Sequence, residues 1–454
     1  MITIRKRLAL DTTDEGMSLI EVVVALMVFM VISVGVAYSS VTILRMTEDI
    51  RSRQVASNLA TSELDHARAT ADPFDIVNGT STAVVSGTTY TITRSTSWVE
   101  TSGADVACGS GTGTLQAKRV NVTVTWNGML NTTQPVRSDT LISPDTRIND
   151  PALGTIRISV LNVAGTGSAG VAVTVTPTTT GAALTTPPDP TDTDGCSFAL
   201  KVSPGTYKVA ISRADSVDTL QVANPFQTVT VTAGGSVASQ FQYDYAGKFN
   251  LTYANNVAGA TPKLPENLDT SYVSTYGVYV DSGRKSQVAL HPVPSGYTGI
   301  AGKYIAPSQS GAGCVSVDPA AWSQATVNGT ALAAGVRAAP VAAAPQGQVG
   351  MGIPMGVVNV KYTGAAYLTA VSATAPSSAA DPGCATAMTY TYGQVLINGT
   401  VAVALPYGSW TLYSSSTAGG TKTPITNSNL GIVGTLLGAL LGGNVITVDP
   451  RLAR

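Results

Sequence analysis

Residues 16–44 are GMSLIEVVVALMVFMVISVGVAYSSVTIL, and this stretch decides the fold of the N-terminal part of the chain. Between positions 17 and 44 the only charged residue is Glu21, and 23 uncharged residues separate it from Arg45. As a helix, that uncharged run would be about 35 Å long, enough to cross a hydrocarbon core of about 30 Å. No proline precedes Pro73. The sequence therefore predicts a membrane-spanning helix over 17–44.

The residues before this span predict its orientation. A basic cluster, Arg5, Lys6 and Arg7, is followed by an acidic segment over 11–16. Basic residues beside a span tend to stay on the cytoplasmic side. A secretory signal would end in a small-residue cleavage site after the apolar run, and no such site follows here. We expect a single-pass protein of the cytoplasmic (inner) membrane, with its N-terminus in the cytoplasm and its ectodomain outside.

Glu21 is unusual inside such an apolar run. A carboxylate in a membrane helix costs roughly 2.5 kcal/mol or more unless it is paired or near the interface. The helix dipole offsets only about 0.3–1 kcal/mol of that cost. A positive group should therefore meet Glu21. Cleavage after Gly16 would create an α-amino group on Met17, four residues before Glu21, and this amine could also reach Glu21 of a neighbouring subunit.

The sequence Gly-Met-Ser-Leu-Ile-Glu-Val at 16–22 resembles the type III signal of type IV prepilins and type II secretion pseudopilins. The resemblance implies that residues 1–16 are a leader peptide. It also implies that prepilin peptidase cuts after Gly16 and N-methylates Met17, and that Glu21 is the carboxylate needed for assembly. The family usually has Phe at the first mature position; Met17 is similar to the minor pilin V and minor pseudopilin I branches. The implied partners are the peptidase, other pilin or pseudopilin subunits, and the membrane.

The helix is predicted to continue to residue 70 and to be followed by strands. Five apolar residues recur at the spacing of one helix face: Ala56, Leu59, Ala60, Leu64 and Ala67. Residues 89–93 and 120–126 alternate apolar and polar side chains, as half-buried strands do. The segments 118–126 and 138–143 are similar to the closing meander of pilin V-type heads. We predict a pilin-type β head over 71–146.

A second unit is predicted over 151–245. Its alternating segments, its Asp194-Gly195 turn and its Pro204-Gly205-Thr206-Tyr207 hairpin resemble the transthyretin-like, carboxypeptidase-regulatory β-sandwich. Both glycines can supply a positive φ at these turns. Three carboxylates near Gly195 raise the alternative of a calcium site: Asp189, Asp192 and Asp194. Their spacing does not match an EF-hand loop, so we interpret them as a solvated turn.

Residues 246–454 are predicted to form a second mainly-β domain. Asn398-Gly399 separates two apolar runs and predicts a hairpin. Residues 406–413 repeat the Pro-Gly-aromatic pattern of 204–209, which suggests a second sandwich. The apolar, glycine-rich segment 430–443 is too short to span a membrane. We interpret it as a buried or loosely packed hairpin loop, with a partner-contacting surface as the alternative. The predicted class is α+β: a long membrane/pilin helix, a pilin-type β head and two mainly-β sandwich-like domains.

The cysteines are even in number and all follow the predicted span: Cys108, Cys196, Cys314 and Cys384. In an exported chain they should form disulfides. Four cysteines allow three connectivities. We favour Cys314 with Cys384, inside the last region, and Cys108 with Cys196, which would connect the head to the second unit. Because no pair has CxxC spacing, neither a zinc site nor redox catalysis is expected.

The composition favours a structural or binding protein over an enzyme. Charged residues make up 12% of the chain, against about 25% in ordinary soluble proteins. A net charge of −1 gives no indication of nucleic-acid binding. The two histidines are far apart, and we find no nucleophile constellation, phosphate loop or metal-ligand pattern. We expect no catalytic activity, no cofactor and no metal.

These features together predict a minor type IV pilin that is processed after Gly16 and assembled through its N-terminal helix. Its large β domains would be displayed near the filament tip, at the pilus or cell surface, for adhesion to a surface or host ligand or for assembly priming. The alternative is a minor pseudopilin of a type II secretion or DNA-uptake system. A third hypothesis is a membrane-anchored enzyme or binding protein that keeps its helix uncut.

Overall fold

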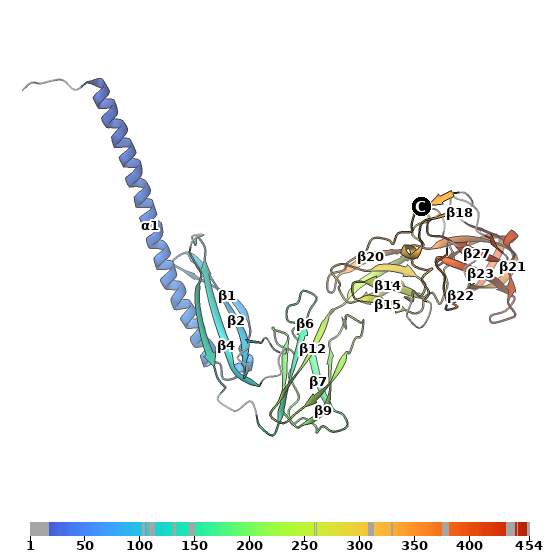
Figure 1. Ribbon diagram of the computed structural model, residues 1–454, viewed down its shortest axis with the longest axis horizontal. Coiled ribbons are helices and arrows are strands. Elements are labelled where there is room, and N and C mark those ends of the chain that lie inside the picture. Colours follow the sequence, from blue (N-terminus) through green and yellow to red (C-terminus); the bar gives the residue numbers. More distant parts are fainter. Residues whose placement is uncertain are drawn as a thin grey trace, which may run out of the picture. The chain divides into compact units, whose positions relative to one another are not determined.

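A computed structural model describes the following residues: 18–101, 105–106, 108, 114–129, 133–144, 150–257, 259, 261–306, 313–327, 330–374, 381–432, 441–442 and 444–451. The described chain is one long helix, α1 (Leu19–Ala69), followed by β-sheets (Figure 1). The predicted class, one N-terminal helix followed by mainly β structure, is confirmed. Contacts divide the chain into two compact units, with the boundary between residues 146 and 147. Two segments before this boundary, 100–102 and 106–115, belong to the second unit. These segments lie inside the range predicted for the head.

The head is an antiparallel sheet that packs against the C-terminal half of α1 (Figure 1). A short 3-10 helix (Pro73–Asp75) connects α1 to the sheet. The strands are β1 (Gly79–Val85), β2 (Thr88–Glu100), β3 (Asp105–Val106), β4 (Leu115–Trp126) and β5 (Val136–Ile142). Their order is β1-β2-β4-β5, with β3 paired to β2.

The predicted helical face and the predicted strand alternation meet in the core of the head. Four of the five predicted helix residues are buried: Ala56, Ala60, Leu64 and Ala67. They pack on inward-facing residues of the sheet, among them Tyr90, Val120, Val122, Val124 and Trp126. The small alanines allow the helix to approach the sheet closely. An ion pair between Arg94 and Glu63, with a 2.7 Å contact, adds a polar link between β2 and α1.

Residues 151–245, here called the sandwich, form two sheets with one shared core. The first has the order β10-β12-β6-β8 and the second the order β11-β9-β7. The strands are β6 (Gly154–Leu161), β7 (Ala172–Pro177), β8 (Cys196–Val202), β9 (Gly205–Ser212), β10 (Ser216–Asp218), β11 (Phe226–Val231) and β12 (Ser236–Tyr245). β6 and β12 are parallel; the other pairs are antiparallel.

One predicted turn in the sandwich is correct and one predicted hairpin is wrong. Gly195 follows Asp194 in a tight turn with φ of +75°. Pro204-Gly205, however, joins β8 to β9, which belong to different sheets, so it carries the chain across the sandwich. Glycine is required there because φ is +155° and a Cβ would lie 2.6 Å from the Cα of Gly181. The local sequence predicts the bend at Pro204-Gly205, but it does not predict which strands pair with β9.

Residues 246–451, here called the third region, share one large apolar core. Its sheets have the orders β16-β13-β20, β15-β14-β17, β18-β19 and β22-β21-β23-β27-β26, with β24 beside β23 and β25 beside β21. The strands are β13 (Gly247–Tyr253), β14 (Thr270–Ser274), β15 (Gly277–Asp281), β16 (Gln287–Leu290), β17 (Thr298–Ala301), β18 (Ala325–Val327), β19 (Thr330–Leu332), β20 (Gln348–Ile353), β21 (Gly356–Ser372), β22 (Thr389–Leu405), β23 (Gly408–Ser415), β24 (Thr423–Pro424), β25 (Leu430–Ile432), β26 (Leu441–Gly442) and β27 (Val445–Val448). Short 3-10 helices occupy Pro319–Ala321 and Asn427–Asn429.

The predicted hairpin at Asn398-Gly399 is wrong. Both residues lie inside β22, which pairs with β21 in an unbroken register from Gly356↔Leu405 to Tyr367↔Gln394, and this stretch includes Asn398 and Gly399. A turn there would give up the backbone hydrogen bonds that the equally long β21 offers on both sides. Gly399 has φ of +113°, so glycine accommodates the ribbon's local distortion instead of forming a turn. Most of the predicted loop over 430–443 lies outside the described residues.

The third region should unfold when alkali ionises its tyrosines. Burial raises the pKa of Tyr272, Tyr390, Tyr392 and Tyr407, and raises that of Tyr297 to about 12. An unfolded tyrosine ionises near pH 10. The unfolded state therefore loses protons first, and stability is complete below about pH 10 and falls as pH rises above it. A spectrophotometric titration should show cooperative tyrosine ionisation coupled to unfolding; independent ionisation without loss of strand structure would contradict this.

Candidate functional site

The N-terminal half of α1 is an apolar surface that nothing in the described chain covers. Every residue from 18 through 41 is exposed. By length and composition, α1 is the helix among the described residues that could cross a membrane. Figure 1 shows this half extending beyond the sheet that covers the other half. An exposed apolar surface of this extent needs lipid or other helices around it.

Three hydroxyl groups in and just after this segment are satisfied within the helix. Ser40 donates to the carbonyl of Val36 at 2.9 Å, and Thr42 donates to the carbonyl of Tyr38 at 2.9 Å. Thr47 makes the same contact one turn further on. Such bonds one turn back let hydroxyls enter an apolar environment without unpaired donors. These three hydroxyls can therefore lie in lipid without an unpaired donor.

Glu21 lies in the first turn of α1, where the sequence predicts the assembly carboxylate. The helix begins after Ser18, which makes no side-chain cap, and the amide of Glu21 donates to the carbonyl of Ser18 at 2.9 Å. The side chain of Glu21 is exposed among apolar neighbours. The unpaired amide groups of a helix N-terminus favour a negative charge there. Gly16 and Met17, the predicted cleavage and methylation residues, lie outside the described residues.

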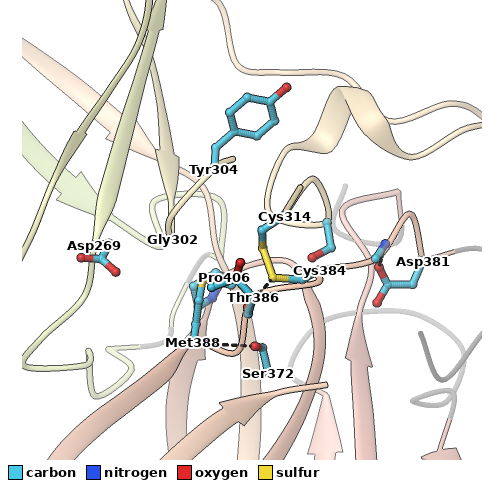
Figure 2. The surroundings of a disulfide bond; sticks show 12 residues. Asp269, Gly302, Tyr304, Cys314, Ser372, Asp381, Cys384, Thr386, Met388 and Pro406 are labelled. Carbon is cyan, nitrogen blue, oxygen red and sulfur yellow. Dashed lines mark hydrogen bonds between the residues drawn. A yellow bond between two sulfur atoms is a disulfide. The ribbon is translucent and has the colours of Figure 1, made fainter. Parts of the chain in front are cut away.

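The structure joins the cysteines as Cys108–Cys196 and Cys314–Cys384, which are the two pairs favoured from the sequence. Figure 2 shows the second disulfide between two loops of the third region. Backbone bridges Ile305↔Cys314 and Cys314↔Cys384 surround it. Next to it, Asp381 accepts hydrogen bonds from the amide of Gly383 and the hydroxyl of Ser409. The disulfide therefore adds a covalent link between two loops that also pair through backbone hydrogen bonds.

The Cys108–Cys196 disulfide fastens a loop of the head's sequence to β8. In the sequence, β2 of the head ends before this loop and β4 begins after it. By its contacts, however, the chain at 100–102 and 106–115 belongs to the second unit. A buried ion pair acts at the same place, because the Glu100 carboxylate accepts from the Arg157 guanidinium of β6. Their side chains are 3% and 0% exposed. A covalent and an ionic link thus anchor Cys108 and Glu100 on the sandwich.

Removing the second disulfide should destabilise the third region selectively. Cys314 and Cys384 are 70 residues apart, and by the chain-entropy model such a loop contributes about 4 kcal/mol. We expect Cys314→Ser/Cys384→Ser to lower hydrogen-exchange protection of β23 by about a thousandfold. The matched control, Cys108→Ser/Cys196→Ser, should reduce protection of β8 and leave β23 unchanged. Equal loss at both strands in either variant would show that the links are not local.

One of the three carboxylates considered for calcium, that of Asp192, holds the turn itself. The Oδ1 of Asp192 accepts hydrogen bonds from the amides of Asp194, at 2.9 Å, and Cys196, at 2.8 Å. This is the Asx-type contact that holds a turn. The described residues contain no group of three or more His, Cys, Asp or Glu placed to hold a metal ion.

A cavity of about 190 Å³ lies in the third region, and no pattern in the sequence predicts it. It lies between β17, residues 335–338 and the C-terminal residues Pro450 and Arg451. Two arginines at its wall form ion pairs: Arg337 with Asp318 and Arg451 with Asp449. Tyr407 also lines the cavity and is 5% exposed. No local motif marks this site, because its lining comes from positions spread between 256 and 451.

No family model matches the chain, and no curated protein matches it. The structure has a weak similarity to that of the Bacillus anthracis TIE protein, with 13% identity over 77% of this chain and 70% of that chain, at a TM-score of 0.19. A second similarity is to BcpA, the major pilin subunit of Bacillus cereus, with 10% identity over 61% of this chain and 96% of that chain, at a TM-score of 0.18. With TM-scores this low, neither similarity bears on the function.

Proposed function

We propose that this chain is a minor type IV pilin, processed after Gly16 and assembled through α1. The sandwich and the third region would then be displayed near the filament tip, for adhesion or for assembly priming. In this proposal the protein binds and presents, and it catalyses no reaction. Its partners are the prepilin peptidase, other pilin subunits and, at first, the lipid of the inner membrane.

The observation that carries the proposal is the division of α1 into two halves of opposite character. The C-terminal half buries a face of alanines and one leucine against the head. The N-terminal half exposes every side chain through residue 41, and Glu21 is its only charge from 18 to 44. A simple anchor would need the apolar surface but not the carboxylate, which is costly in lipid. A helix that leaves lipid to pack in a polymer gives Glu21 a positive partner.

Mass spectrometry of the mature N-terminus tests the processing step. We expect a chain that begins with N-methyl-Met17, because the cut after Gly16 produces the amine that is to pair with Glu21. Gly16→Leu should leave an uncut chain of full length in the membrane. A working protein that retains Met1 would contradict the proposal and would favour an uncut membrane anchor.

Location distinguishes the pilin from the pseudopilin. A minor pilin should be found on filaments sheared from the cell surface, at a small fraction of the major subunit. A pseudopilin would remain in the cell envelope, and its deletion would stop secretion or DNA uptake. The size of the domains after α1 favours the first, since bulky domains are more easily accommodated at a tip than along a repeating shaft.

A further inference from the structure

The cavity in the third region presents hydrogen-bonding groups that the protein leaves unused. Arg337 binds Asp318 through Nε, at 2.8 Å, and Nη2, at 2.5 Å, so its Nη1 has no partner among the described residues. The hydroxyl of Tyr407 also has no hydrogen-bond partner among the described residues. Tyr407 lines the cavity, and its ring is nearly buried. Unpaired polar groups at a cavity wall are costly unless water or a ligand meets them.

The backbone of Gly299 adds a donor and an acceptor on the same wall. The amide and carbonyl of Tyr297 both pair with Val341, on the edge of β17 away from β14. In an antiparallel strand every second residue points to the same edge, so Gly299 points there too. No backbone hydrogen bond joins Gly299 to residues 337–340, although Thr298 donates through its side chain to the carbonyl of Ala338. The two segments separate here and leave the cavity between them.

The charges around the cavity cancel, which argues against an ionic ligand. Both oxygens of Asp318 receive hydrogen bonds from Arg337, and both oxygens of Asp449 receive them from Arg451. Asp318 and Asp449 are 3% and 4% exposed. An ionised ligand would lose its hydration without meeting a net opposite charge. A neutral molecule that both donates and accepts hydrogen bonds fits this wall.

The volume of the cavity and the chemistry of its wall restrict the class of ligand further. A cavity of about 190 Å³ exceeds the roughly 150 Å³ that admits one benzene and is smaller than the about 300–1,000 Å³ of drug-sized pockets. It therefore suits one six-membered ring. Apolar contacts come from Ile300, Val317, Pro319 and Pro354. A plain hydrocarbon ring would leave Gly299, Arg337 and Tyr407 without hydrogen-bond partners.

We propose that this cavity binds one neutral pyranose unit of a glycan. The C–H faces of the sugar contact the proline and aliphatic walls, and its hydroxyls pair with Gly299, Tyr407 and Nη1 of Arg337. Arg337, whose side chain is 34% exposed, lies at the mouth, whereas Arg451, at 1%, lies deep. The inference rests on the proposed adhesive function and gives it a class of ligand.

The test is ligand-observed saturation-transfer NMR on the full chain in a detergent without a sugar head group. The probes are methyl glucopyranoside, methyl galactopyranoside and methyl mannopyranoside, with glucuronic acid as the charged counterpart of the same ring. We expect saturable binding of at least one neutral pyranoside and at least tenfold weaker binding of the acid. No binding of any neutral pyranoside, or tighter binding of the acid, overturns the proposal.

Two variants locate the binding. Tyr407→Phe removes one hydroxyl from a packed ring and should weaken binding about tenfold, and Ala338→Trp should fill the cavity and abolish binding. The matched control is Tyr276→Phe, whose hydroxyl contacts Gln242 and does not line the cavity; it should bind as the parent does. Unfolding midpoints show that each variant is folded. Binding that survives both cavity variants would place the sugar elsewhere and overturn the proposal.

The outcome for sugar binding is separate from the outcome for assembly. Binding is measured on purified protein and needs no filament. A correctly processed chain that begins with Met17 but binds no pyranoside would exclude the glycan proposal and leave the pilin proposal standing. Binding by a chain that is never cut would keep the sugar site and remove the pilin proposal.

Discussion

Replacing Glu21 by alanine is expected to leave membrane insertion intact and to reduce incorporation into filaments about a hundredfold. The apolar run does not need Glu21 to insert, and removing a charge makes insertion easier. In the polymer, however, the amine on Met17 of an arriving subunit would lose its partner. An unpaired charge inside a membrane-like helix bundle costs roughly 2.5–3.5 kcal/mol, and each 1.4 kcal/mol is about tenfold in an equilibrium.

Two further variants separate the charge of Glu21 from its shape. Glu21→Gln keeps the length of the side chain and should fail nearly as severely, because the amide cannot neutralise an amine. Glu48→Ala removes an exposed carboxylate from the same helix outside the span and should assemble normally. Quantitative immunoblots of sheared filaments and of membranes measure both pools. Normal incorporation of Glu21→Gln would exclude charge pairing as the mechanism.

Replacing Arg157 by methionine should be the most destabilising single change in the sandwich. The change leaves the Glu100 carboxylate, which is 3% exposed, buried without its cation. Breaking one side of a buried ion pair costs about 3–5 kcal/mol, because the remaining charge is uncompensated. Arg157 lies in the middle of β6, between β12 and β8. Hydrogen exchange should therefore show β6 losing most of its protection, while β23 in the third region is unchanged.

The double variant Glu100→Leu/Arg157→Met tests this explanation. The double variant removes the Glu100–Arg157 ion pair as a whole and leaves neither of these two charges buried alone, so most of the lost stability should return. Glu100→Leu alone should destabilise, because it leaves the guanidinium buried without its carboxylate. A double variant as unstable as Arg157→Met would mean that the shape of the arginine, rather than its charge, holds β6.

The span, the position of Glu21 and the buried face of α1 could all be predicted from the sequence. Each depends on periodicity or composition over neighbouring residues, which a helix converts directly into geometry. The burial of Ala56, Ala60 and Leu64 follows from a 3.6-residue repeat, and the alternation in β4 follows from a two-residue repeat. The favoured disulfide pairs needed only the even number of cysteines and their distribution among domains.

Strand partners and the sugar-sized cavity were decided by tertiary structure alone. Asn398-Gly399 has the composition of a turn, but β21 offers it a continuous ladder, and pairing satisfies more backbone groups than a turn would. The cavity wall brings Gly299, Arg337 and Tyr407 together, although they are spread over more than a hundred residues of the sequence. A local sequence pattern determines structure that depends on interactions between residues close together in the chain. Which distant backbone groups pair, and which remain unpaired around a cavity, depends on how the whole core packs.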